Sequence, residues 1–478
     1  MVRIKQFTRE LLKSDFAYGF GAGLVYFGYT FSWIWALYPL NSVGITNSGL
    51  AFLLVAIGFG GSIIVSAIPW GLFTFFLGRF SQLQSVWFWP LTIAGTFTIL
   101  EYVRAWLLGI VWLGSGSRLG PYWTFGNLAY WFADVSFIAR SAAFWGIYGI
   151  TFIIVLLIMI AVIGIKRRRL SISYGAQVLA IILLLALAFI PLPGQQFTPV
   201  DVAIIQTQKA TRPFYSSGEV LIDFRQKLDL VSQAAQRMPN GGYILLPEGA
   251  DFSTSLAKFL DVQQVKNYFQ KLSNQEIILI DNVEIASQGE KKISRSLVVS
   301  SKRGALGQYD KFVLSPWGEF RPYIANIVLW LSGNKPASEN SLQPGPARSP
   351  IEFDRQQIEI IVCSDVLSPQ RGDVRVLFGM GSLGFFNGNE RVQSQISAAA
   401  RFRALESGKY LVWASNGGRS YIINPLGKAT GELLEPGYEI LTGSIIPNDT
   451  RTWYNRVGDW PILLLSLAFF ATGLRKRA

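Results

Sequence analysis

Long apolar runs flanked by basic residues constrain the fold of this chain more than any other feature of its sequence. A helix needs about 20 apolar residues to cross a bilayer, and half of the 478 residues are apolar while only 15% are charged. The apolar runs cover residues 16–40, 50–77, 86–110, 138–165 and 172–192, with a short sixth at 460–474. We therefore predict a polytopic α-helical membrane domain with six spans.

Basic residues at the ends of these runs predict how the chain is oriented. Arg79, the block Lys166–Arg169 and the tail Arg475–Arg477 fall on the same side as the basic N-terminus if there are six spans. By the positive-inside rule this side faces the cytoplasm. The predicted domains are a membrane domain of about five helices at residues 1–193, an extracytoplasmic domain at 194–456, and a final helix with a basic cytoplasmic tail at 457–478.

Composition excludes several kinds of chemistry. The chain has no histidine and a single cysteine, Cys363, so a Ser-His-Asp triad, a histidine-ligated metal site and an internal disulfide are impossible. The net charge of +13 lies largely beside the apolar runs, which is typical of topology determinants and not of a nucleic-acid-binding face. We expect no metal, no cofactor and no nucleic-acid partner.

The long polar stretch alternates between strand-like and helix-like segments. β-Branched runs at residues 200–207 and 358–365 predict strands, and the spacing of apolar residues over 391–406 predicts a helix. Residues 255–272 are predicted as one helix and 304–311 as a turn-rich segment. Alternating strands and helices are typical of α/β layers, so we predict one domain whose sheets are covered by helices.

Cys363 lies near the end of a strand-like run, where it is a candidate nucleophile. A free cysteine is usually a small buried hydrophobe, and a reactive thiol needs a base, which in a chain without histidine must be a carboxylate or a lysine. Glu248 follows another strand-like run and is placed to take the proton, while Lys311 can stabilise a thiolate or an oxyanion. Glu248 can equally cap a helix and Lys311 can equally be a solvated surface residue, so these residues alone leave both interpretations open.

The order of Glu248, Lys311 and Cys363 resembles the catalytic set of the nitrilase superfamily. The resemblance extends to four further stretches, namely Leu246–Ala250, Tyr309–Phe320, Arg403–Glu406 and Ser415–Gly418. With apolar spans on both sides of such a domain, the chain resembles the apolipoprotein N-acyltransferase family. The stretch Glu101–Trp106 is also similar to the membrane part of that family, and its Glu101 and Arg104 are spaced to form an ion pair on one helical face.

This resemblance implies a fold, a location and a reaction. The fold is a nitrilase-like α-β-β-α sandwich on the periplasmic side of the bacterial cytoplasmic (inner) membrane. The reaction moves an acyl chain from a phospholipid, through a thioester on Cys363, to the N-terminal amine of a diacylglyceryl-cysteine lipoprotein. Glu248 is the implied base, Lys311 and the backbone N–H of Ser364 hold the oxyanion, and Glu319 supports them.

Two other functions fit the same residues. A membrane-anchored amidase of the nitrilase superfamily would hydrolyse a C–N bond with water as the acceptor. A non-catalytic lipid-binding module on the same scaffold is disfavoured, because Glu248, Lys311 and Cys363 are all present. A lipid route from the bilayer would favour the acyltransferase, and a water-filled polar pocket would favour the amidase.

The chain departs from the family pattern at three places. The family usually has eight spans and here we predict six. Its usual Tyr-Glu after the nucleophile is here Ser364-Asp365, and its Asp-Gly-Trp-Phe loop is here Leu383–Phe386. The bulk of that loop is retained in Phe385 and Phe386, which we expect in the wall of an acyl-chain site.

One apolar segment, residues 324–331, is too short to span a bilayer and costly to expose to water. It can be a buried core helix. We favour a segment that enters the outer interface of the membrane that the chain spans. Trp330 would then lie at headgroup depth as a contact for the lipid substrate.

Overall fold

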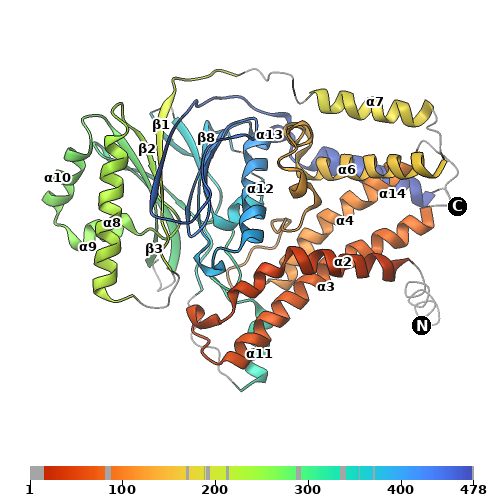
Figure 1. Ribbon diagram of the computed structural model, residues 1–478, viewed down its shortest axis with the longest axis horizontal. Coiled ribbons are helices and arrows are strands. Elements are labelled where there is room, and N and C mark those ends of the chain that lie inside the picture. The colour runs from red at the N-terminus through yellow and green to blue at the C-terminus, as the bar shows by residue number, and fades with distance from the viewer. Residues whose placement is uncertain are drawn as a thin grey trace.

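The chain folds into a helical bundle joined to an α/β domain (Figure 1). The computed structural model describes residues 15–80, 88–167, 172–187, 189, 194–210, 215–286, 292–333, 341–354, 356–369 and 372–475. The bundle contains α2 (Phe16–Thr30), α3 (Ser48–Phe80), α4 (Trp89–Val111), α6 (Ala142–Arg167) and α14 (Trp460–Arg475), and α7 (Ile172–Leu187) lies outside α6.

Three of the six predicted spans form helices that are long and apolar enough to cross a membrane by themselves, namely α3, α4 and α6. The other three form shorter helices of 15 or 16 residues. The first span is shorter than predicted, because the helix ends at Thr30 and the apolar chain continues as two 3₁₀ helices, η1 (Ser32–Leu37) and η2 (Leu40–Val43). Trp33 and Ile34 of η1 are buried, so this apolar sequence packs inside the protein.

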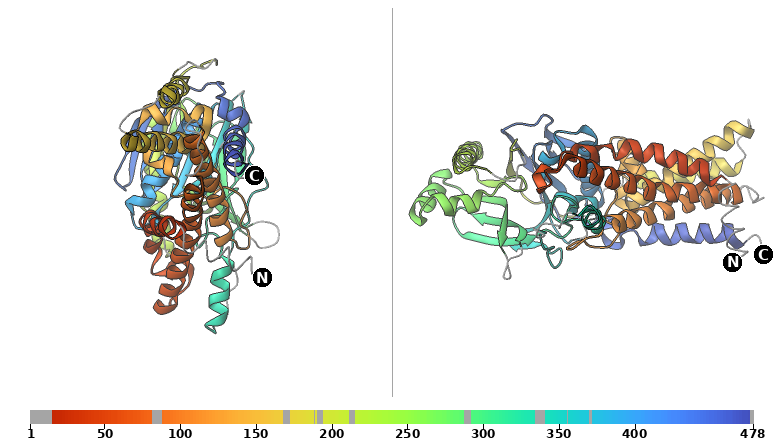
Figure 2. Two further views of the ribbon diagram at one scale, coloured as in Figure 1. Left: turned by 90° about the vertical axis from the view of Figure 1, so that its right-hand side faces the viewer. Right: turned by 90° about the horizontal axis from the view of Figure 1, so that it is seen from below.

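The bundle helices alternate in direction and place their basic ends far from the α/β domain. Thr74 near the end of α3 donates a hydrogen bond to the carbonyl of Asp15 at the start of α2. The hydroxyl oxygen of Thr92, near the start of α4, lies 3.5 Å from the hydroxyl oxygen of Thr472, near the end of α14. These helix ends lie at the side of the bundle remote from the sheets (Figure 2).

The predicted ion pair inside α4 is present. Arg104 Nη2 lies 2.6 Å from Glu101 Oε1, and both side chains are buried. Arg104 Nη1 also donates to the carbonyl of Phe125 at 2.7 Å, which fastens the loop after α4 to the bundle. The pair is structural, because a buried charge is tolerated only when it is paired and hydrogen-bonded.

The α/β domain contains two six-stranded sheets packed face to face. The first runs β12 (Glu439–Ile445), β1 (Val200–Gln206), β2 (Gly242–Leu245), β3 (Ile277–Ala286), β4 (Lys292–Ser300), β5 (Gly304–Asp310). The second runs β11 (Ala429–Leu433), β10 (Ser420–Ile423), β9 (Tyr410–Asn416), β8 (Val376–Ser382), β7 (Gln356–Val362), β6 (Ile351–Phe353). Alternate residues of β7, including Ile358, Ile360 and Val362, share a core with Ile204 of β1 and Leu245 of β2, as expected when both faces of a strand are buried.

Helices cover both outer faces, which confirms the predicted α-β-β-α sandwich. The first sheet packs against α8 (Ser217–Gln236), α9 (Phe252–Phe259) and α10 (Val262–Leu272). The second packs against α12 (Glu390–Ser407), which lies between that sheet and the bundle (Figure 1). One layer of helix therefore faces solvent, and the other joins the sandwich to the membrane part.

Two local predictions were wrong. The single helix predicted at 255–272 is two helices, because Asp261 caps the second one by accepting a hydrogen bond from Gln264 N at 2.8 Å. The segment predicted as turn-rich at 304–311 is strand β5, which pairs with β4. Tertiary pairing with β4 overrides the weak strand propensity of its two glycines.

Candidate active site

A cavity of about 480 Å³ lies where the sandwich meets the bundle. Its polar side comes from the α/β domain and includes Glu248, Lys311, Glu319 and Cys363. Much of its apolar side comes from η1, η2 and the loop after α4, and includes Trp33, Leu37, Leu40, Val43, Trp112, Trp123 and Phe125. A single cavity therefore exposes the only thiol of the chain to an apolar wall built by the membrane part.

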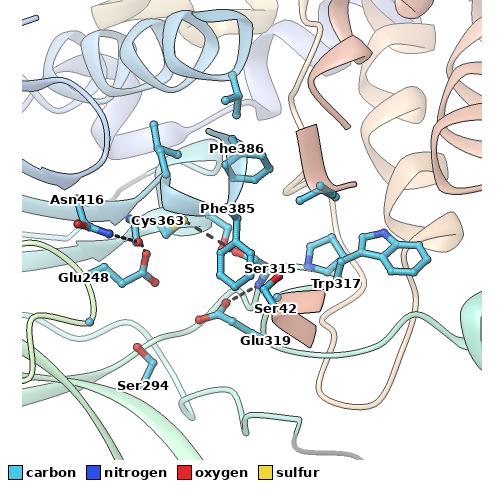
Figure 3. A pocket seen from close by; sticks show the side chains of 18 of the residues that line it. Ser42, Glu248, Ser294, Ser315, Trp317, Glu319, Cys363, Phe385, Phe386 and Asn416 are labelled. Carbon is cyan, nitrogen blue, oxygen red and sulfur yellow. Dashed lines mark hydrogen bonds between the residues drawn. The ribbon is translucent and has the colours of Figure 1, made fainter. Parts of the chain in front are cut away.

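Cys363 lies just beyond β7, at the first residue of the 3₁₀ helix η4 (Cys363–Leu367). Its backbone φ is 46°, in the left-handed region that non-glycine residues rarely adopt. Such strain persists only where the surrounding structure enforces it, and it is concentrated at functional sites. The turn directs the thiol toward Glu248 and Ser315 (Figure 3).

Lys311 joins two carboxylates at the base of the cavity. Its Nζ lies 2.8 Å from Glu248 Oε1 and 2.8 Å from Glu319 Oε2. The lysine side chain is 1% exposed, and the remaining Glu248 oxygen accepts a hydrogen bond from Ser382 N at 2.9 Å. An ammonium has three protons, and two of them form the hydrogen bonds to Glu248 Oε1 at 2.8 Å and to Glu319 Oε1 at 2.9 Å.

Burial and neighbouring charges set the protonation of this cluster. Burial raises the pKa of the Cys363 thiol to about 12, with Glu248 adding to the effect and Lys311 opposing it. Burial alone would lower the pKa of Lys311, but Glu248 and Glu319 raise it well above its ordinary value, so the lysine is charged. Burial also raises the pKa of Glu319 to about 6. A raised pKa favours the neutral thiol of Cys363, and a thiol reacts only when a base removes its proton.

Asp365 fastens the nucleophile turn to the segment that carries Lys311. It accepts hydrogen bonds from Tyr309 Oη at 2.7 Å and from Val313 N at 2.8 Å, and it is buried. Tyr309 and Val313 lie two residues before and two residues after Lys311. The aspartate after the nucleophile thus fixes the spacing between thiol and ammonium.

Two serines near the thiol complete the polar wall. Ser364 donates a hydrogen bond to the carbonyl of Val313. Ser315 Oγ lies 3.1 Å from Ser364 Oγ and 4.0 Å from Cys363 Sγ (Figure 3). The sequence analysis did not identify Ser315 as a site residue. The available signal was its position midway between Lys311 and Glu319.

The predicted acyl-contact residues divide into two groups. Phe385 and Phe386 line the cavity together with Cys363, and the Phe386 ring packs edge-on against Trp33 of η1, with ring centres 5.3 Å apart. Trp330 lies elsewhere. It is 73% exposed on α11 (Tyr323–Leu331), outside the cavity lining.

Trp317 connects the Lys311–Glu319 segment to the membrane part. It lines the cavity and adopts a positive φ of 71°. Its ring lies against Gly58 of α3, where an added Cβ would approach the ring to 3.1 Å. In Figure 3 the indole points away from Glu319 toward the bundle. A glycine at position 58 lets this ring dock, so the catalytic segment is held by both parts of the protein.

Comparison with known proteins gives matches to both parts of the chain. Residues 2–160 match the family model described as the apolipoprotein N-acyltransferase N-terminal domain. The chain is 27% identical to the apolipoprotein N-acyltransferase of Haemophilus ducreyi, covering 98% of this chain and 89% of that protein. It is 26% identical to the Pseudomonas aeruginosa protein of the same name, covering 93% and 83%.

Among solved structures, the chain is similar to Saccharomyces cerevisiae Nit3, a member of branch 10 of the nitrilase superfamily, with a TM-score of 0.39 and 15% identity. That alignment covers 53% of this chain and 92% of Nit3. An amidase from Nesterenkonia sp. aligns with a TM-score of 0.38 and 15% identity, covering 55% of this chain and 94% of the amidase.

Proposed function

Since the chain belongs to the apolipoprotein N-acyltransferase family, we propose that it transfers an acyl chain from a phospholipid, through a thioester on Cys363, to the N-terminal amine of a diacylglyceryl-cysteine lipoprotein. The observation that carries the proposal is the shared cavity, in which Cys363 and Lys311 face apolar residues of the membrane part. Moving an acyl chain through water costs about 0.8 kcal/mol per CH₂. An amidase acting on a soluble substrate would need no such apolar wall.

In the first step Glu248 takes the proton of Cys363 and the sulfur attacks the ester carbon. The carbonyl electrons move to oxygen, and the Lys311 ammonium and the backbone N–H of Ser364 stabilise that charge. When the oxyanion collapses, the C–O bond to the glycerol breaks. The leaving oxygen takes the proton back from Glu248, which gives a lysophospholipid and an acyl-Cys363 thioester.

In the second step the lipoprotein amine attacks the thioester carbon, and Glu248 accepts the proton that the nitrogen loses. The C–S bond breaks and its electron pair returns to sulfur. Glu248 then returns the proton to Cys363, and the product is an amide. Glu319 holds Lys311 through both steps and needs to exchange no proton.

The exposed face of α11 supports access from the bilayer. Ile327, Trp330 and Leu331 are 56%, 73% and 70% exposed, whereas Ala325 and Leu329 are buried. An apolar face of this kind is stable at the membrane interface and costly in water. In one view of Figure 2, α11 and the red segment that leads into α3 project in the same direction. We propose that α11 lies in the outer leaflet of the bacterial inner membrane, with the sandwich on the periplasmic side.

The role of Glu248 is tested by Glu248→Gln, which keeps the shape of the side chain but removes the base. We expect the rate of Cys363 acylation by phospholipid to fall by about 10²-fold or more, the usual contribution of a positioned base. The measurement is single-turnover mass spectrometry of the purified protein. Glu439→Gln, at an exposed carboxylate of the edge strand β12, is the matched control and should react normally. Near-normal acylation of the Glu248 variant would remove this residue from the mechanism.

The proposed orientation is tested with single cysteines in a Cys363→Ala background. Arg79→Cys, in the last turn of α3, should be labelled by a membrane-impermeant maleimide only after the cells are opened. Val262→Cys, which is 87% exposed on α10, should be labelled in cells whose outer membrane alone is permeable. The expectation follows from the positive-inside rule. Labelling of position 79 from the periplasm would reverse the assignment.

A further inference from the structure

We propose that Ser315 is a further catalytic residue, whose hydroxyl donates a hydrogen bond to the sulfur of Cys363 whenever that sulfur carries negative charge. The assignment rests on the proposed acyl transfer, because sulfur is then the attacking group in one step and the leaving group in the next. The contact is direct: Ser315 Oγ lies 4.0 Å from Cys363 Sγ (Figure 3). Ser315 lies on the loop after β5, opposite the nucleophile turn.

The hydroxyl of Ser315 has one proton and two acceptors within reach. One acceptor is Cys363 Sγ, and the other is Ser364 Oγ at 3.1 Å. Ser364 uses its own proton to bind the carbonyl of Val313, so it accepts from Ser315 and does not donate to it. A neutral thiol is a weak acceptor, which favours Ser364 at rest. A thiolate makes a stronger, charge-assisted bond, so the hydroxyl rotates toward sulfur as the charge forms.

Ser315 is held in place by the same carboxylate that holds Lys311. Its backbone N–H donates to Glu319 Oε2 at 2.6 Å, and Glu319 N donates back to the Ser315 carbonyl at 3.1 Å. The following residue, Pro316, has a fixed φ and restricts the conformation of Ser315. The hydroxyl oxygen therefore stays beside the sulfur, and only a rotation of the O–H about the Cβ–Oγ bond is needed to change partners.

The charges around Cys363 Sγ explain why a further hydrogen-bond donor would stabilise a negative charge on that sulfur. Glu248 and Glu319 both disfavour a negative sulfur, and Lys311 favours it but is shared between those two carboxylates. When the lipoprotein amine attacks the thioester, the C–S bond breaks and the electron pair goes to sulfur before Glu248 returns the proton. Ser315 stabilises sulfur in that interval without a change in its own protonation.

The test measures thiolate formation directly, with iodoacetamide and no lipid. Cys363 is the only thiol, so the alkylation rate against pH reports its ionisation. We expect Ser315→Ala to react about 10-fold more slowly at neutral pH, the scale of one hydrogen bond to a charged group, and to need higher pH for half-maximal rate. Ser315→Thr keeps the hydroxyl and should restore both the rate and the pH profile.

Ser444→Ala is the matched control, because it removes an exposed hydroxyl on β12, outside the cavity lining. Its thiol should react at the wild-type rate. A wild-type pH profile for Ser315→Ala, or equal slowing in Ser315→Thr, would overturn the proposal, and so would slowing of Ser444→Ala to the same extent. A chain that shows the Ser315 effect but never becomes acylated by phospholipid would support the hydrogen bond and contradict the acyl transfer instead.

Discussion

Replacing Cys363 with alanine should abolish acyl transfer, with a loss of at least about 10⁴-fold in rate. Loss of a covalent nucleophile removes the thioester path entirely, and single replacements of this kind in other enzymes reach about 10⁶-fold. The wild-type protein incubated with phospholipid should gain one acyl mass, located on Cys363 by peptide mass spectrometry. The alanine variant should gain none. Its fold should survive, because only one sulfur atom at a partly exposed position is lost.

A thiol elsewhere should not replace Cys363. Val262→Cys in the Cys363→Ala background places a thiol at an exposed position of α10, outside the cavity lining. This variant should react with maleimide and remain free of acyl adduct. Sustained transfer by the Cys363→Ala protein, or an acyl group on another residue of the wild type, would refute the thioester mechanism.

The layers of the fold were predictable because the spacing of apolar residues shows which face of a strand or helix is buried. The run predicted as a strand at 358–365 is apolar on the side that meets the other sheet. Its residues 358–362 form β7, whereas 363–365 belong to the 3₁₀ helix η4. The runs at 50–77 and 138–165 are helices, as their length requires. The spacing of apolar residues did not predict the structure of segments whose conformation depends on contacts with distant parts of the chain. β5 is a strand because β4 pairs with it, and neither glycine within it predicts this.

Part of the site was predictable from residue type alone. In a chain without histidine, a single thiol leaves few candidates for a base, and the structure does bring Glu248, Lys311 and Cys363 into one cavity. The roles of Ser315 and Asp365 were not predictable in this way. Serine and aspartate are common in loops, and their importance comes from partners about 50 residues away in sequence. Trp330 lies outside the cavity lining, and its contact with lipid at the membrane interface stays a prediction.

Replacing Lys311 with methionine should lower acyl transfer by about 10²–10³-fold, the scale for removing one preorganised oxyanion donor. It should also destabilise the protein by about 3–5 kcal/mol, because breaking a buried ionic cluster leaves charges without a partner. Glu248 and Glu319, with side chains only 13% and 15% exposed, would then face each other without the shared ammonium. A proton taken up by Glu319 then relieves the repulsion between the two carboxylates.

The pH dependence of this loss has a definite sign. The pKa of Lys311 is raised in the folded protein, so its stabilising contribution is fully present below the unfolded pKa of about 10.4 and is lost only as the pH rises through the folded value. At neutral pH the Lys311→Met variant therefore lacks the whole stabilising contribution of the lysine. Burial raises the pKa of Glu319 to about 6, so the repulsion between the two carboxylates disappears as Glu319 takes up a proton at acidic pH. Thermal unfolding in detergent should show a smaller difference in Tm between variant and wild type at acidic than at neutral pH.

Lys409→Met separates the catalytic effect of Lys311 from the cost of losing any buried lysine. Lys409 is 1% exposed, and its ammonium donates to the carbonyl of Asn448 at 2.8 Å. Burial lowers its pKa to about 8, so it is a buried cation whose bonds go to an amide residue. This variant should lose stability and keep its acylation rate per folded molecule, measured by single-turnover mass spectrometry. If both variants lose activity only in proportion to their loss of folded protein, Lys311 serves the fold, and the oxyanion must be held by other groups.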